Sequence, residues 1–126
     1  MNVKKTMAYA LTATLMFVSG QALAADAEKG EKTFKKCAVC HSVEPGDKKK
    51  KPGPNLAGVV GREAAMVANF KYSSAMKKSG LTWDEATLDK YLTKPKKLVP
   101  KTKMVFPGLK KAKDRANVIA YLKSIK

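Results

Sequence analysis

Apolar residues recur at helical spacing in three parts of the chain. In the first part, residues 26–40 (DAEKGEKTFKKCAVC), Gly30 and Phe34 are four apart and therefore share one face of a helix. Acidic residues stand in the first turn and lysines near the end, which is the charge order that the helix dipole favours. The pattern predicts a first helix over residues 26–40.

Two further helices are predicted in the second half of the chain. Thr82 and Glu85 have the spacing of a capping box, and apolar residues then recur at helical spacing until Pro95. This predicts an amphipathic helix over residues 83–94. Residues 111–124 carry a broad apolar stripe, which predicts a terminal helix.

The segments between these helices have the composition of loops. Residues 44–55 (EPGDKKKKPGPN) are rich in proline and glycine and carry four successive lysines. Residues 95–108 contain three prolines and a glycine, which exclude a long helix and favour an extended, loop-like run. The sequence has no internal repeat and no convincing strand. We therefore expect an all-α, single-domain fold.

The first residues indicate export from the cytoplasm. Lys4 and Lys5 precede an apolar run over about residues 7–18, and small residues then lead to Ala-Leu-Ala at residues 22–24. The run is shorter than the roughly 20 residues that a membrane-spanning helix requires. We expect residues 1–24 to be a cleaved signal peptide and residues 25–126 to form one domain in the periplasm.

Composition limits how this domain folds. So small a domain, with few large apolar residues, needs disulfides, a metal or a bulky cofactor to complete its core. The two cysteines both lie in one short motif, so they supply no disulfide framework. The formal net charge is +16, or +14 without the signal peptide. We expect no nucleic-acid partner, because the chain is exported and carries no nucleic-acid-binding motif.

The motif CAVCH, residues 37–41, carries the chemistry. A structural zinc site needs four ligands, and Cys37, Cys40 and His41 are the only cysteines and histidine of the chain. A redox dithiol is expected near a βαβ pattern, which is missing. Covalent attachment of haem explains every residue of the motif, since one helical turn presents both sulfurs and the imidazole to the same face of a porphyrin. The expected cofactor is one haem c, with His41 as an iron ligand.

The sixth ligand of the iron distinguishes an electron carrier from a haem enzyme or gas sensor. Met66, Met76 and Met104 are the candidates in residues 25–126. Met104 is favoured because it lies in the proline-stiffened 95–108 segment, and the other two are expected to be packing residues. A thioether favours iron(II), so a His/Met pair raises the reduction potential and leaves no position for a substrate.

Taken together, the chain closely resembles class I c-type cytochromes, in particular the mitochondrial-like and alphaproteobacterial soluble forms. The motifs that carry the resemblance follow the family order across residues 25–126: FKKCAVCHSVEPG, GPNLAGVVGR, FKYSSAM, GLTWDEATLDKYLTKPKKLVPKTKMVFPGLKK and RANVIAYLK. The resemblance implies an all-helical cytochrome c fold around one covalent haem, with Met104 as the second axial ligand. It also implies that the first and last helices cross at Gly30, Phe34 and Tyr121. Met76 departs from the asparagine that is common at its position.

The resemblance further assigns supporting roles around the haem. Pro54 would accept a hydrogen bond from the His41 ring, and the residues expected at the propionates are Arg62, Tyr72, Ser73 and Trp83. The residues expected on the Met104 side are Tyr91, Thr102 and Phe106. The lysines expected to surround the exposed haem edge are Lys36, Lys96, Lys97, Lys103, Lys110 and Lys111.

These features predict a soluble, monomeric one-electron carrier. Its expected partners present acidic surfaces: a cytochrome bc-type complex or periplasmic dehydrogenase on one side, and a terminal oxidase or photosynthetic reaction centre on the other. Two alternatives stay open at this point. One is a haem enzyme or gas sensor, such as a peroxidase, with a labile sixth ligand, and the other is a cationic protein that binds anionic membrane surfaces.

Overall fold

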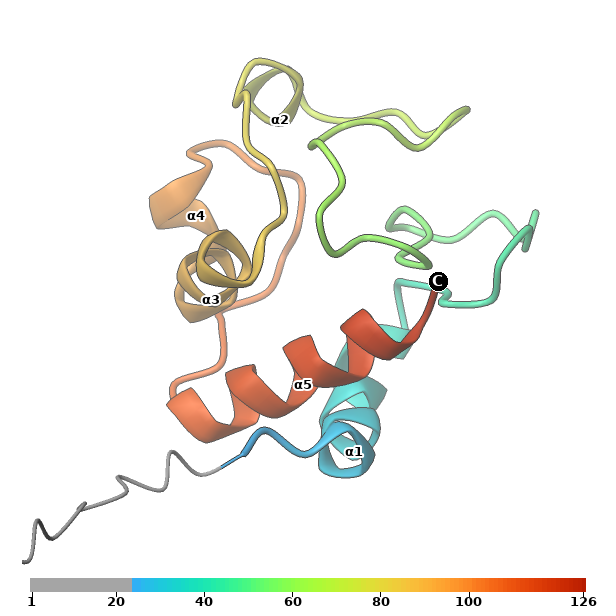
Figure 1. Ribbon diagram of the computed structural model, residues 1–126. Helices are drawn as coiled ribbons and strands as arrows, with labels where there is room; N and C mark the ends of the chain where they lie inside the picture. Colours follow the sequence, from blue (N-terminus) through green and yellow to red (C-terminus); the bar gives the residue numbers. More distant parts are fainter. Residues whose placement is uncertain (1–23) are drawn as a thin grey trace, which may run out of the picture.

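Two helices from opposite ends of the domain cross at the base of the molecule (Figure 1). They are α1 (Ala27–Ala38) and α5 (Ala112–Ser124), in a computed structural model that describes residues 24–126. The expected signal peptide lies outside the described residues, apart from Ala24. Within residues 24–126, each helix is too short or too polar to cross a lipid bilayer.

Helix α1 confirms the predicted first helix but ends earlier, at Ala38. Asp26 caps its start, and the side chain accepts a hydrogen bond from the Lys29 N–H at 3.0 Å. At the other end, the Cys37 carbonyl accepts hydrogen bonds from the Cys40 and His41 N–H groups at 3.0 and 2.9 Å. The helix therefore ends in a hydrogen-bonded turn that contains the CAVCH motif.

The crossing of α1 and α5 depends on a glycine. A Cβ atom at Gly30 would overlap the backbone carbonyl of Asn117 and lie 2.8 Å from the Tyr121 Cβ. The absence of a side chain at Gly30 lets the two backbones meet, and Phe34 packs on Tyr121 with ring centroids 5.4 Å apart. The contact implied by the family resemblance is confirmed.

Helix α3 (Glu85–Thr93) confirms the second predicted helix, but the predicted capping box is wrong. The cap is Asp84, whose side chain accepts a hydrogen bond from the Thr87 N–H at 2.7 Å. A short carboxylate immediately before the first helical residue reaches that N–H directly. Thr82 instead forms an isolated antiparallel bridge with Glu63. The terminal helix, predicted over residues 111–124, is confirmed as α5.

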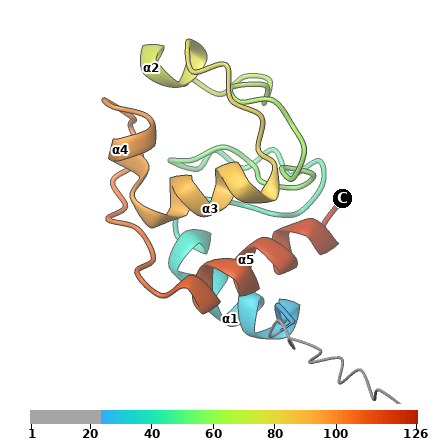
Figure 2. The ribbon, with the colours of Figure 1, turned by 60° about the vertical axis from the view of Figure 1, so that its left-hand side comes forward.

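Two one-turn helices were not predicted. Helix α2 (Ser74–Lys77) is capped by the Ser73 hydroxyl, and α4 (Pro95–Leu98) begins with a proline, which suits a first helical turn. The rest of the predicted loop after Leu98 is irregular up to Lys111. Figure 2 shows α3 between α5 and α2, with α4 following directly from α3.

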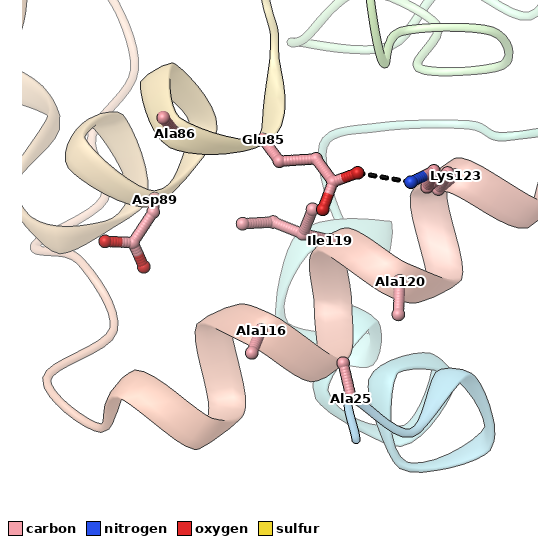
Figure 3. Close-up of a pocket in the computed structure, with 8 residues that line it drawn as sticks. All are labelled: Ala25, Glu85, Ala86, Asp89, Ala116, Ile119, Ala120 and Lys123. Carbon is pink, nitrogen blue, oxygen red and sulfur yellow. Dashed lines mark hydrogen bonds and ion pairs between the residues drawn. The ribbon is translucent and has the colours of Figure 1, made fainter. Parts of the chain in front are cut away.

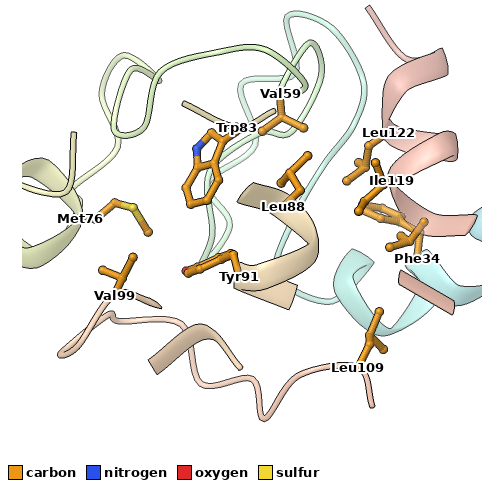
Figure 4. Packing of buried hydrophobic residues seen from close by; sticks show 11 residues of the cluster. Phe34, Val59, Met76, Trp83, Leu88, Tyr91, Val99, Leu109, Ile119 and Leu122 are labelled. Atoms are coloured by element: carbon orange, nitrogen blue, oxygen red, sulfur yellow. The ribbon is translucent and has the colours of Figure 1, made fainter. Parts of the chain in front are cut away.

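The buried hydrophobic side chains form one cluster and come from most of the elements (Figure 4). Met76 from α2, Leu88 and Tyr91 from α3, and Ile119 and Leu122 from α5 belong to one cluster. The other members are Phe34, Val59, Trp83, Val99, Leu109 and Val118. The helices therefore do not each have a separate core.

We predict that Gly30→Ala destabilises the protein by about 1–3 kcal/mol, because the added methyl group overlaps the α5 backbone. The loss should appear although alanine has the better helix propensity. Denaturant unfolding followed by circular dichroism measures the change. Glu31→Ala, on an exposed position of the same helix, is the matched control and should have little effect. A Gly30→Ala protein more stable than the wild type would contradict the crossing.

Candidate cofactor-binding site

A cavity of about 310 Å³ occupies the centre of the core cluster. Cys37, Cys40, His41 and Met104, the four residues predicted to hold a haem, all line it. The predicted supporting residues also line the cavity, and they are Pro54, Arg62, Tyr72, Ser73, Trp83, Tyr91, Thr102 and Phe106. Cys37 and Met104, which are 67 positions apart in the sequence, therefore meet at one site.

The two cysteines lie in the turn that ends α1. Both are free thiols, with Cys37 half-buried and Cys40 exposed. Burial raises the pKa of the Cys37 thiol. A redox-active dithiol needs the opposite, a cysteine whose pKa is lowered so that the thiolate can attack. The site thus disfavours the redox dithiol and leaves both sulfurs available at the cavity.

The His41 ring is oriented by one backbone hydrogen bond. Its Nδ1 lies 2.7 Å from the Pro54 carbonyl oxygen, which can only accept, so Nδ1 carries the proton. Burial lowers the pKa of His41, and this effect is larger than that of the hydrogen bond to Pro54, which raises the pKa. The imidazole is therefore neutral near pH 7, and the lone pair of Nε2 is available to a metal.

The segment before Pro54 also packs on this ring. A Cβ at Gly53 would lie 2.7 Å from Nδ1 and 2.8 Å from Nε2 of His41, so the glycine lets the backbone approach the ring face. The Gly53 N–H donates to the Cys40 carbonyl at 2.8 Å. Gly53 was not predicted to belong to the site, although a glycine between two prolines in a loop can indicate a close backbone approach.

Met104 belongs to the irregular segment that follows α4. Its N–H donates to the Thr102 hydroxyl oxygen at 3.3 Å, and that oxygen lies 3.2 Å from the Tyr91 hydroxyl. Burial raises the pKa of Tyr91, so the phenol stays protonated and available for this hydrogen bond. The hydrogen bond between Thr102 and Tyr91 therefore connects the segment that contains Met104 to α3.

The other two candidate methionines differ from each other. Met76 is buried, lines the cavity and belongs to the core, as expected of a packing residue. Met66 is 60% exposed and does not line the cavity, so the expectation that it packs in the core was wrong. It follows a positive-φ residue, Ala65, in an irregular segment that turns it toward solvent.

The predicted propionate group already makes hydrogen bonds within the protein. The Arg62 guanidinium donates to the carbonyls of Ala57 and Asn55 at 2.9 and 3.1 Å. The Tyr72 hydroxyl accepts from the Val67 N–H at 3.2 Å, and the Ser73 hydroxyl accepts from the Met76 N–H at 3.0 Å. These bonds fix the side chains at the cavity wall, and Arg62 retains further N–H donors for an anionic group.

The predicted docking lysines fall into two sets. Lys36 and Lys103 are exposed and line the cavity, and Lys103 also donates to the Lys71 carbonyl at 2.9 Å. Lys96, Lys97, Lys110 and Lys111 are exposed but lie outside the cavity lining. The structure therefore brings two of the six to the edge of the site.

A second pocket lies between α3 and α5 and is different in chemistry (Figure 3). Glu85 pairs with Lys123 across it, and alanines form much of its lining. It contains no cysteine, histidine or methionine. Among residues 24–126, no group of three or more histidine, cysteine or acidic side chains is placed to bind a metal ion.

The residues of the central cavity fit a haem. The lining is mainly apolar, as a porphyrin requires, and aromatic side chains such as Phe34, Trp83 and Tyr91 contribute to it. Two thiols, a neutral imidazole and a thioether are the groups that would attach and ligate a haem, and Arg62 would provide a cation for its carboxylates.

Comparisons with known proteins agree with this chemistry. The family model for cytochrome c matches residues 27–126. Cytochrome c2 of Rhodomicrobium vannielii is 54% identical over 110 residues, which cover 87% of this chain and 87% of that protein. Cytochrome c of Nigella damascena is 52% identical over 104 residues, with coverages of 82% and 93%. The solved structure of cytochrome cH from Methylobacterium extorquens superposes with a TM-score of 0.74 at 48% identity, covering 79% of this chain and 99% of that one.

Cytochromes c and c2 are electron carriers and not enzymes, and they bind one haem c covalently through the cysteines of a C-x-x-C-H motif. Cys37 and Cys40 fit that motif here. The chain therefore belongs to the cytochrome c family and is an electron carrier with one covalent haem c.

Proposed function

We propose that this protein is a soluble, periplasmic one-electron carrier in which His41 and Met104 are the axial ligands of the haem iron. The observation that carries the proposal is that both side chains line the same cavity as the two cysteines. When bound, the haem supplies an iron that gains or loses one electron. The residues that line the cavity and the charged residues at its edge would determine how that electron is held and exchanged.

The ligand pair would suit electron transfer rather than catalysis. Pro54 holds His41 in the tautomer that leaves Nε2 free, and Thr102 holds the backbone of Met104. A soft thioether favours the reduced iron, and two protein ligands leave no position for a substrate. Met76 is the other thioether at the cavity, and we assign it to packing because it is buried in the core.

The surrounding groups would limit the access of water to the haem and provide hydrogen-bond partners for its propionates. Arg62, Tyr72 and Trp83 would bind the propionates, with Ser73 beside them, because a buried carboxylate is costly without hydrogen-bond partners. Phe106 is half-buried and lines the cavity, where it would limit access of water. Tyr91 and Thr102 would support the Met104 side through their mutual hydrogen bond.

Location and partners follow from the N-terminal sequence and the charge. A signal peptide over residues 1–24 would deliver residues 25–126 to the periplasm as a monomer. The net charge of +14 would steer the protein to acidic surfaces and speed association without tight binding. Suitable partners are a cytochrome bc-type complex or periplasmic dehydrogenase as donor, and a terminal oxidase or reaction centre of a respiratory or photosynthetic chain as acceptor.

We predict that Met104→Ala abolishes the weak near-infrared band of methionine-to-iron(III) charge transfer in the oxidised holoprotein, because the thioether is lost. Met76→Leu is the matched control, since it removes the other thioether at the cavity while keeping the apolar volume. Absorption spectroscopy of both variants measures the effect.

The reduced wild type should bind carbon monoxide poorly, because both ligand positions of the iron would be occupied by protein side chains. Rapid carbon monoxide binding by the untreated wild type would favour a gas sensor or haem enzyme instead.

We also predict that the chain does not fold without its haem. Without haem, the apolar side chains that line the 310 Å³ cavity would have no partner to pack against and would be open to water. A small domain has a total stability of only about 5–15 kcal/mol, which leaves little to offset that loss. The double variant Cys37→Ala/Cys40→Ala should therefore be largely unfolded by circular dichroism, whereas Val39→Ala, at an exposed position between them, should fold. A cooperative thermal transition in the double variant would show that the haem is not part of the core.

We predict that Lys36→Glu slows electron transfer to an acidic redox partner at low salt, by several-fold, because Lys36 lies at the edge of the cavity. Lys48→Glu, in the exposed lysine run away from the cavity lining, is the control with the same charge change. Stopped-flow rates at increasing ionic strength should converge, since exposed charges are screened over about 8 Å at 0.15 M salt. Equal slowing by both variants would mean that net charge alone matters.

A further inference from the structure

Lys51 differs from the three lysines that precede it. Lys48, Lys49 and Lys50 are exposed, whereas Lys51 is partly buried. Its ammonium group donates to the Ala38 carbonyl at 2.8 Å and to the His41 carbonyl at 3.3 Å. The fourth lysine of the run is therefore bound to the turn that carries both cysteines.

One of the two carbonyls that Lys51 contacts, that of Ala38, lies at the end of α1 and needs a hydrogen-bond donor. The last turn of a helix leaves its carbonyl groups without intrahelical donors, and they carry the negative end of the helix dipole. Ala38 is the last residue of α1. An ammonium group at this end satisfies the free carbonyl with a charge-assisted hydrogen bond, which is stronger than a neutral one.

The same short segment contacts the turn at two more points. The Gly53 N–H donates to the Cys40 carbonyl at 2.8 Å, and the Pro54 carbonyl lies 2.7 Å from His41 Nδ1. Residues 51–54, which we call the KPGP segment, thus meet the CAVCH turn from Ala38 to His41. Lys51 supplies the only charged side chain of this segment.

We propose that Lys51 is a positioning residue that holds the KPGP segment against the CAVCH turn and thereby fixes the orientation of the His41 ring. Without the hydrogen bonds from Lys51, the KPGP segment loses a contact that holds Gly53 and Pro54 against the His41 ring. The inference rests on the proposed function only in that His41 binds the iron. It does not depend on Met104.

This role separates Lys51 from the docking lysines. Its ammonium donates to two backbone carbonyls within the protein, whereas none of the six predicted docking lysines contacts the CAVCH turn in this way, so Lys51 contributes to the shape of the site as well as to its charge. The run of four lysines therefore contains three solvated residues and one that supports the haem-attachment turn.

The test compares three variants of the holoprotein. Lys51→Met keeps the length and the apolar stem but removes the donor, Lys51→Arg keeps a charged donor, and Lys50→Met removes the same charge from the exposed neighbour. The first measurement is hydrogen exchange of the Gly53 amide in the reduced protein. It should become about tenfold or more faster in Lys51→Met, because a hydrogen bond to a charged group is lost, and stay near the wild-type rate in the other two.

The second measurement reads the ring of His41 directly. The pattern of hyperfine-shifted haem methyl resonances in the oxidised protein depends on the orientation of both iron ligands, and Lys51 contacts only the turn that carries His41. The pattern should therefore change in Lys51→Met and stay as in the wild type in Lys51→Arg. Identical exchange and identical resonance patterns in Lys51→Met and Lys50→Met would overturn the proposal and leave Lys51 as a surface charge. A failure of Met104 ligation would instead appear as a missing near-infrared band in the wild type, and the exchange rate of the Gly53 amide would still distinguish Lys51→Met from Lys50→Met.

Discussion

The central cavity is the constraint on which the structure depends. Phe34, Trp83, Leu88, Tyr91 and Leu122 belong to the buried cluster, and each of them also lines that cavity. Their apolar surface is therefore directed at a cofactor and only partly at one another. A domain of this size has little apolar surface to spare, so a large apolar group in the middle completes the core. This explains why long irregular segments, such as residues 39–73, can be held in place with so little regular structure.

The two cysteines that attach the haem and the proposed ligand His41 lie in one short turn, which the rest of the fold supports from two sides. The end of α1 places Cys37, and the hydrogen-bonded turn after it places Cys40 and His41. The KPGP segment (residues 51–54) lies against this turn and determines which nitrogen of the His41 ring is free. The crossing of α1 with α5 at Gly30 fixes the helix that carries the turn. Helix packing and haem attachment therefore depend on the same element, α1.

The distribution of charge complements this arrangement. The chain has ten acidic residues against 26 basic ones, and two of the acids, Glu85 and Asp89, pair with Lys123 and Arg115 between α3 and α5. At the cavity edge, Lys36 and Lys103 are exposed and form no salt bridge within the described residues. Positive charge is thus left available beside the cavity, where it would steer an acidic partner.

The sequence by itself determined the features that depend on neighbouring residues. The CAVCH motif identified the cofactor because attachment needs two thiols and an imidazole within one turn, and apolar periodicity located the three longer helices. Family motifs then named the cavity residues, all eight of which the structure brings to the cavity. Only the tertiary structure decided the rest. The one-turn helices α2 and α4 are too short to show a period. The N-cap of α3 is Asp84 and not Thr82, although both residue types are suitable caps. The bond from Lys51 to the CAVCH turn joins residues ten and thirteen apart, so no local pattern distinguishes that lysine from its three neighbours.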